Sequence, residues 1–157
     1  MTSIKIQIKG LDGFIEGLKQ APVFTINELN KAVTRSVGLL QNQTIKEAPV
    51  NKQSGGGNLR QSVKSRMTTR ISGEVSVDAK YAGFVHEGTA PHEIRPVIKQ
   101  ALANVRTNQF FGKLVRHPGT QPNPFLERSV KVVTPRIQTL FNEAINNVFK
   151  KISSMAK

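Results

Sequence analysis

Two segments restrict the backbone of this chain more than any other part of its sequence. Residues 81–89 read YAGFVHEGT, and residues 117–126 read HPGTQPNPFL. Each segment holds a Gly-Thr pair, and the second also contains three of the eight prolines. Glycine admits positive φ angles, and proline holds φ near −65°, so few backbone conformations remain for either segment. The pattern predicts two loops of defined shape.

The length and composition indicate a single domain, residues 1–157, with a lean core. Hydrophobic residues make up 38% of the chain and aromatic residues only 6%, so a neighbouring subunit is expected to cover part of the apolar surface. The absence of cysteine excludes disulfides and thiolate metal sites. We find no membrane-spanning apolar run and no signal-peptide pattern, and we expect a soluble protein made in the cytoplasm.

The net charge of +13 is spread through the whole chain. Residues 1–80 carry +6 and residues 81–157 carry +7, so the charge does not belong to a tail. Such a balance favours contact with a polyanion, nucleic acid above all, or with acidic partner proteins.

The first third of the chain predicts one strand and two helices. Isoleucine occupies every second position at Ile4, Ile6 and Ile8, which is typical of a half-buried strand. A short helix is expected to begin at Asp12 and to end near Pro22. Thr25 and Glu28 form a capping box for a second, amphipathic helix, which Pro49 ends.

A flexible loop and a hairpin are expected next. Residues 50–58 contain three consecutive glycines and predict the loop. From residue 60 the polar and apolar residues alternate, and four basic side chains are predicted to share one strand face: Arg60, Lys64, Arg66 and Arg70. A three-residue turn from Ser72 to Glu74 would pair Ile71 with Val75 and keep the apolar face continuous.

The rest of the chain predicts a protruding arm and a long closing helix. Residues 94–116 are expected to form a two-stranded arm, with residues 114–116 on its return side. Asn123 stands as an N-cap and Pro124 at the first helical position. An apolar stripe then continues to Ile152, with Pro135 inside it. We expect either a kink there or a new helix that begins with Thr134 as its N-cap.

The polar residues give little support for an enzyme or a cofactor site. His86-Glu87 and His92-Glu93 suggest metal ligands at first, but their spacing is not that of H-E-x-x-H. His117 before Pro118 is typical of a loop histidine that bonds to the backbone. With two aspartates and no nucleophile or phosphate-loop motif, we expect no catalysis and no cofactor.

Two charged features have alternative interpretations. Glu87 lies among basic residues, where it could form an ion pair that fixes its own loop or a pair across a subunit interface. Four like charges on one strand face would repel one another, so the basic face is expected to meet DNA or an acidic partner. The sequence shows no helix-turn-helix and no zinc finger for specific nucleic-acid recognition.

The order of several short motifs resembles one known family. These motifs are Gly57-Asn58-Leu59-Arg60-Gln61-Ser62, Tyr81-Ala82 with Val85, Glu87, Gly88 and Thr89, Ile94 with Pro96, His117-Pro118-Gly119-Thr120, and Pro124-Phe125-Leu126. Together they resemble the tail-completion or neck proteins of tailed bacteriophages. The resemblance implies an α+β fold in which two main amphipathic helices, the C-terminal one long and kinked, pack with a curved antiparallel sheet. It also implies a structural, non-enzymatic minor tail protein at the head–tail junction.

The resemblance also carries expectations about partners and location. The partners would be head-completion and tail-terminator rings, the protein itself would form a ring, and its location would be the virion, assembled in the host cytoplasm. The expected interface residues are Tyr81, Glu87, Gly88, Thr89, His117, Pro118, Gly119, Thr120, Pro124 and Phe125. A nonspecific DNA contact through the basic face remains open. The alternative is a free, non-enzymatic nucleic-acid-binding protein, and an interfacial membrane protein is less well supported.

Overall fold

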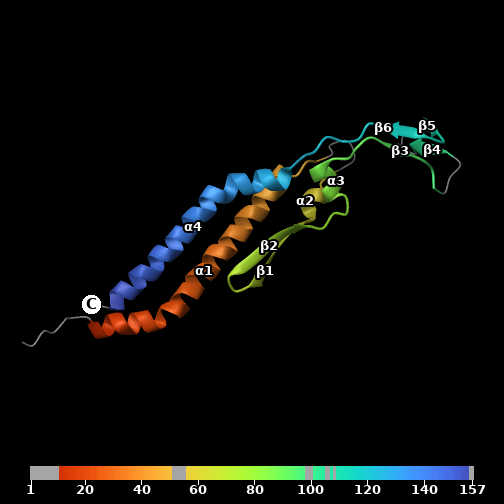
Figure 1. The fold of residues 1–157 in the computed structure, drawn as a ribbon. Helices are drawn as coiled ribbons and strands as arrows, with labels where there is room; N and C mark the ends of the chain where they lie inside the picture. The colour runs from red at the N-terminus through yellow and green to blue at the C-terminus, as the bar shows by residue number, and fades with distance from the viewer. Residues whose placement is uncertain (1–10, 51–55, 98–100, 105–106, 108, 156–157) are drawn as a thin grey trace, which may run out of the picture.

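The computed structural model describes residues 11–50, 56–97, 101–104, 107 and 109–155. These residues form an α+β fold, as predicted. Two long helices lie side by side, a hairpin packs along the first helix, and a thin arm extends from the end opposite the C terminus (Figure 1). The arm and the helix pair meet at two short helices, where the two constrained sequence segments also lie.

Helix α1, Leu11–Glu47, is longer than the sequence predicts. The expected break at Pro22 is wrong, because the helix continues through this proline, although it changes direction in its first half (Figure 1). Proline lacks the N–H that a helix interior needs, and such sites commonly bend a helix without ending it. The predicted strand of Ile4, Ile6 and Ile8 lies outside the described residues.

Helix α4, Phe125–Met155, runs antiparallel to α1 and closes the fold. It continues through Pro135 and changes direction near its beginning in Figure 1, which agrees with the predicted kink. The alternative restart at Thr134 is wrong, because the hydroxyl of Thr134 donates a hydrogen bond to the Val130 carbonyl inside the same helix (2.7 Å).

Small side chains allow α1 and α4 to approach closely. Ala32 and Ala144 are buried between the helices with Leu140, and Leu39 and Phe141 pack around them. Buried hydroxyl groups of both helices donate to the carbonyl four residues earlier: Ser36 to Ala32, Thr44 to Leu40 and Ser129 to Phe125. The helix pair therefore buries polar side chains without leaving these hydroxyl groups unsatisfied.

A second core cluster joins the helix pair to the rest of the molecule. Phe125 and Ala48 are fully buried there, next to Leu59 of the short helix α2, Asn58–Gln61. Partly buried apolar residues surround this cluster: Val77, Ala79, Ala82, Val85 and Leu126. The predicted loop of residues 50–58 thus ends where α2 begins, and residues 51–55 of that loop lie outside the described residues.

The hairpin consists of β1, Val63–Thr69, and β2, Ser72–Val77. Its register differs from the predicted one, because Thr69 pairs with Ser72 and the turn consists of Arg70 and Ile71, with an irregularity between Met67 and Thr69. The predicted pairing of Ile71 with Val75 is therefore wrong, since Val75 pairs with Ser65.

The arm is built from two short antiparallel pairs, as expected for residues 94–116. Near the body, β3, His92–Ile94, pairs with β6, Val115–His117. Farther out, β4, Leu102–Asn104, pairs with β5, Gln109–Gly112. Val97 and Phe110 of the arm are 96% and 78% exposed, so the arm presents apolar side chains to solvent.

The whole chain exposes far more surface than a compact protein of its mass. Its accessible area is 12220 Å², whereas the scaling law for folded monomers gives about 7,800 Å² for 17.3 kDa. Large exposed apolar side chains occur on the arm, on α3 and on both long helices. The fold is therefore extended, with apolar surface that the described residues leave uncovered.

Candidate functional site

The first constrained segment contains a short helix, α3, Ala82–Glu87. Its first turn forms when Val85 N–H donates to the Tyr81 carbonyl (3.1 Å), and it ends at Gly88, whose φ is 75°. The segment is therefore a helical turn followed by extended backbone, and not a loop throughout. Val85 faces the core, whereas Phe84 on the same turn is 66% exposed.

The second constrained segment lies directly beside the first. Thr89 and Thr120 form an antiparallel bridge with backbone N–H to O distances of 3.0 and 3.1 Å, and their hydroxyl oxygens are 3.0 Å apart. A glycine precedes each threonine, and a Cβ on either glycine would collide with the backbone of the opposite segment. Gly88 and Gly119 thus permit the close approach that holds the two segments together.

Asn123 connects this junction to the long helix α4. Its N–H lies 3.1 Å from both the Val85 and the His86 carbonyls, where it caps α3. Its side-chain oxygen accepts a hydrogen bond from Arg128 (2.7 Å), which also contacts Glu47 at the end of α1 (3.0 Å). One asparagine therefore fixes α3 relative to the adjoining ends of both long helices.

Between the two segments lies an open hollow of about 910 Å³. Its wall contains two exposed aromatic residues, Tyr81 and Phe84, which are 45% and 66% accessible. The other lining residues come from both segments and from the base of the arm: Val85, Glu87, Gly88, Thr89, Ala90, His92, His117, Thr120, Gln121 and Asn123. We call this feature the junction hollow. A wall that combines exposed aromatic groups with polar groups is typical of a protein-binding surface.

A second, smaller hollow of about 460 Å³ lies beside the first. Tyr81 and Val85 line both, so the ring of Tyr81 stands at the boundary between them. The remaining lining comes from residues 49–50 and 56–59, at the two ends of the glycine-rich loop. Together the two hollows extend the accessible concave surface from that loop to the base of the arm.

The structure brings most of the predicted interface residues to the junction hollow. Six of the ten line it: Tyr81, Glu87, Gly88, Thr89, His117 and Thr120. Gly119 lies behind the wall, at the threonine bridge. The prediction for Phe125 is wrong, because its side chain is wholly buried in the core of the same chain.

The histidines have structural roles in this arrangement. The rings of His92 and His117 stack across the β3–β6 pair with centroids 5.1 Å apart, and His117 Nδ1 accepts the Gly119 N–H (3.0 Å). The backbone role expected for His117 is thereby confirmed. Among the described residues, no group of three or more metal-binding side chains lies close together.

His86 packs edge-on against the Phe125 ring, with centroids 5.5 Å apart. Its Nε2 lies 3.9 Å from a carboxylate oxygen of Glu127. Its Nδ1 is buried and has no hydrogen-bond partner among the described residues. The ring therefore acts mainly as an apolar element that joins α3 to the start of α4.

Glu87 is exposed at the rim of the junction hollow. Within the described part of the chain it takes part in no ion pair. The interpretation in which Glu87 fixes its own loop through an ion pair has no support here, and the interface interpretation stays a prediction.

The four predicted basic residues do not form one strand face. Arg60 lies on α2 and donates from Nε to the Ala48 carbonyl (2.9 Å), which caps the end of α1. Lys64 and Arg66 do share the outer face of β1, but they form ion pairs with Asp78 (2.8 Å) and Glu74 (2.7 Å). Arg70 lies in the hairpin turn. The predicted DNA contact stays a prediction, but the predicted face is wrong because Arg60 and Arg70 do not lie on the strand. Acidic neighbours also offset the charge of the two residues that do.

The pair between Lys64 and Asp78 changes the protonation of both groups. The hydrogen bond from the ammonium group lowers the pKa of Asp78 below its ordinary 3.8 and raises the pKa of Lys64 above 10.5. Both charges therefore persist from mildly acidic to alkaline pH, and the outer hairpin face is a mixed-charge surface over that range.

Sequence reasoning missed several residues of the junction hollow. Phe84 and Gln121 lie inside the two constrained segments but were not selected, and Ala90 and His92 lie just beyond them. The short helix α3 explains Phe84, because its turn points Val85 to the core and leaves Phe84 outside. The sequence does contain one indication of this: Phe84 and Val85 are adjacent apolar residues in a segment too short to bury both of them.

Comparisons with protein-family models, curated proteins and solved structures found no match. In the described part of the chain, no helix combines the length and the apolar character that crossing a bilayer requires.

Proposed function

We propose that this chain is a structural subunit of a tailed-phage virion, a tail-completion or neck protein that joins head and tail through protein–protein contacts. The junction hollow is the contact surface for the adjoining subunit or ring. The observation that carries the proposal is the convergence of the two motif-bearing segments in one open, aromatic-lined hollow.

The physical character of the surface supports a protein partner. Phe84 is 66% exposed beside Tyr81, and these rings gain most from a partner that excludes water. Glu87 lies at the rim and forms no ion pair within the described residues. A basic side chain of the partner could pair with it and so orient the complex. Two exposed aromatic rings beside polar groups suit docking of a protein partner.

The extended shape supports an assembly subunit. A chain that exposes 12220 Å², with apolar groups on the arm and on both long helices, becomes fully covered only between neighbours. Two of the motifs in the order that resembles neck proteins supply residues to this hollow: Tyr81, Glu87, Gly88 and Thr89, with His117 and Thr120.

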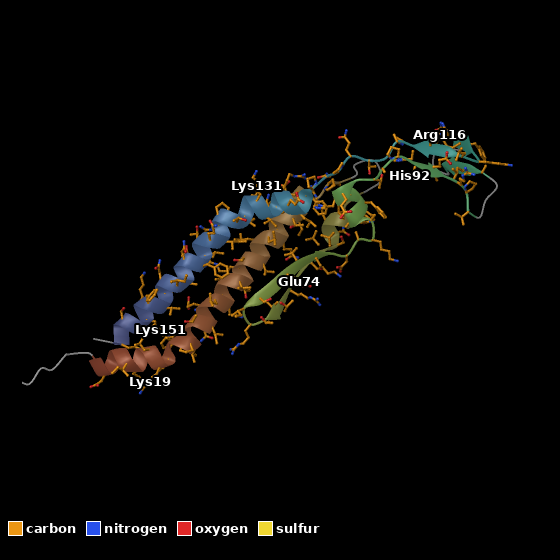
Figure 2. The ribbon with its side chains drawn as sticks, in the orientation of Figure 1. Lys19, Glu74, His92, Arg116, Lys131 and Lys151 are labelled. Atoms are coloured by element: carbon orange, nitrogen blue, oxygen red, sulfur yellow. The ribbon has the colours of Figure 1, made fainter. Side chains whose placement is uncertain are left out.

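The second candidate, a nonspecific nucleic-acid-binding protein, is favoured by the net charge of +13. Lys19 and Lys151 lie at one end of the helix pair, and Lys131 lies toward the other end (Figure 2). Among the described residues, the cations of β1 are paired to carboxylates, which makes the outer hairpin face a poor match for a phosphate backbone.

The test is complementation of a phage that lacks this gene, with Phe84→Asp as the informative variant. We expect the wild-type chain to restore plaques and to be found at the head–tail junction by immunogold microscopy. We expect Phe84→Asp to lower plaque yield by about a hundredfold or more, since a charge in a desolvated aromatic contact costs several kcal/mol. Separate heads and tails should accumulate.

Phe149→Asp is the matched comparison, because Phe149 has a similar exposure (63%) but lies on α4 away from the hollow. A smaller loss of plaque yield than with Phe84→Asp would separate the hollow from the exposed helix surfaces. Both variants should keep wild-type helical circular dichroism. Normal plaque yield with Phe84→Asp would refute the docking role of the hollow. Absence of the chain from purified virions, together with salt-sensitive binding to random duplex DNA, would favour the second candidate.

A further inference from the structure

We propose that the outer arm of one copy of this chain docks in the junction hollow of a second copy, with Phe110 as its apolar anchor and Lys113 paired to Glu87. The outer arm consists of β4, β5 and residues 113–114. All three side chains are exposed and belong to the described part of the chain. The inference names the partner of the hollow, so it rests on the docking role proposed above.

Glu87 has no cation of its own in this strongly basic chain. Eight of the ten acidic side chains approach a lysine, arginine or histidine nitrogen to 3.9 Å or less. Among the described residues the exceptions are Glu87 and Asp12, and Asp12 lies in the first turn of α1, where helix N–H groups offset its charge. Glu87 instead ends α3, where carbonyl groups disfavour a carboxylate. It therefore offers an exposed anion that a cation from outside would stabilise.

The outer arm supplies a cation without an acidic partner. Of the other described basic side chains of the arm, Arg95 and Arg116 both approach Glu93, at 3.0 and 3.7 Å. Lys113 is exposed in the bend between β5 and β6 and forms no ion pair with any described residue. Lys113 and Glu87 are thus opposite charges, on the arm and at the hollow, that one copy leaves unmatched.

The apolar surface of the outer arm matches the aromatic wall of the hollow. Phe110 is 78% exposed on β5, and Phe111 and Leu114 are also exposed nearby in the sequence. The hollow presents the exposed rings of Tyr81 and Phe84. Contact between Phe110 and these rings would remove apolar surface of both copies from water and would permit edge-to-face or offset ring packing.

The dimensions of the two surfaces are compatible. The hollow measures about 910 Å³, which lies within the range of about 300–1,000 Å³ of pockets that enclose whole ligands. The outer arm is a ribbon only two strands wide, at the far end of the arm from the helices (Figure 1). Two-stranded sheets are marginally stable alone. Docking would therefore stabilise the ribbon as well as cover the hollow.

A second copy is the partner because the outer arm does not occupy the hollow of its own chain. Neither Phe110 nor Lys113 belongs to the described lining of that hollow. Each copy carries both an outer arm and a hollow, so one kind of contact joins two copies reciprocally or several copies head to tail in a closed ring. The mass of the complex distinguishes these two forms, and both fit the inference.

A charge exchange in the full-length chain tests the inference. Glu87→Lys and Lys113→Glu each place like charges together at the contact, and we expect each to weaken self-association at least tenfold in sedimentation equilibrium at low salt. An equimolar mixture of the two variants restores opposite charges between unlike copies, so association should return to near the wild-type level. The double variant that carries both changes should associate as well.

Lys131→Glu is the matched control, because Lys131 is an exposed residue of α4 and the change alters the net charge by the same amount as Lys113→Glu. Both changes lower a net charge of +13, which by itself favours association. Weaker association with Lys113→Glu alone would therefore report a specific contact. Only exposed residues are changed, and circular dichroism checks that each variant keeps the fold.

Three results would overturn the inference. The first is a wild-type chain that stays monomeric at submillimolar concentration. The second is unchanged association of Glu87→Lys or Lys113→Glu. The third is association that the single variants lose and their mixture does not restore, because the two charges would then act at separate contacts or within one copy.

Phage complementation separates this inference from the proposed function. If Phe84→Asp fails to restore plaques while Lys113→Glu restores them fully, the hollow docks another protein and only the arm contact is wrong. If the charge exchange restores self-association but Phe84→Asp gives normal plaque yield, the contact between copies stands and the proposed function fails.

Discussion

Gly88 and Gly119 show how single residues determine the geometry of the junction hollow. Their φ angles are 75° and 85°, and the space that a Cβ would need is occupied by backbone of the opposite segment. The sequence singled out both positions because each glycine stands in a Gly-Thr pair, and Gly119 also follows a proline. It could not predict that the two glycines face one another, since that contact joins residues about thirty positions apart.

Gly119→Ala should therefore weaken the junction more than an ordinary glycine substitution. Gly112→Ala is the matched control, because its φ of 82° is similar but nothing among the described residues lies within 4 Å of the added Cβ. We expect Gly112→Ala to cost about 1 kcal/mol from backbone strain alone. Gly119→Ala should cost roughly 3 kcal/mol, because collision adds to strain.

The measurement is hydrogen exchange at the amides of Thr89 and Thr120, which donate across the bridge. Their protection should fall in Gly119→Ala and remain near wild type in Gly112→Ala, which lies in β5 of the arm. Equal losses in both variants would mean that positive φ, and not close approach, fixes the junction.

The long helices and the hairpin show where local sequence rules are overridden. The capping box of Thr25 and Glu28 predicted a helix start, but Glu28 instead accepts hydrogen bonds from Lys31 (2.6 Å) and from Asn147 of α4 (3.1 Å). These hydrogen bonds lower the pKa of Glu28. Packing against α4 thus uses a side chain that could have capped a separate helix, and α1 continues across Pro22.

The hairpin register was wrong for a related reason. Gly73 suggested a turn, but it lies within β2 opposite Met67. A Cβ there would lie 2.7 Å from a methyl group of Val37 on α1. The glycine therefore permits close packing of the hairpin on the helix, which the alternation of residues in the hairpin cannot reveal.

Gly73→Ala should destabilise the packing of the hairpin on α1. We expect the free energy of unfolding to fall by about 1–3 kcal/mol, as for other overpacked sites. Gly38→Ala is the matched control, because Gly38 lies in α1 with nothing within 4 Å of its added Cβ among the described residues. It should stabilise the helix by roughly 0.5–1 kcal/mol. Urea titration followed by circular dichroism measures both, and destabilisation of similar size in both would contradict the packing role.

At the scale of the whole molecule, the lean composition predicted incomplete coverage of apolar surface, and the apolar stripe after Pro124 predicted a long closing helix. The α+β architecture was implied by the motif resemblance, and the fold agrees with it. The arm was predicted from a poor pattern, and its apolar residues, such as Phe110, remain exposed. Any cover for such residues would come from other chains, so neither the sequence nor one copy of the structure specifies it.

The exposed surface leads to a prediction for unfolding in urea. An unfolded chain of 17.3 kDa exposes about 25,000 Å², and the folded chain still exposes 12220 Å². Unfolding therefore uncovers about three quarters of the area expected for a compact protein of this mass. Because the urea m-value scales with that area, we expect a dilute sample to give about three quarters of the usual m-value.

Association of copies of this chain should raise both the urea m-value and the unfolding midpoint. If copies cover one another's apolar surface, both the m-value and the midpoint should rise with protein concentration, and each tenfold increase should add about 1.4 kcal/mol per dimer to stability. Urea titrations across a concentration series, with mass measured by light scattering, provide the test. A monomer with a concentration-independent midpoint and a full-size m-value would contradict the extended, incompletely covered fold, because that outcome requires a chain that already buries its apolar surface alone.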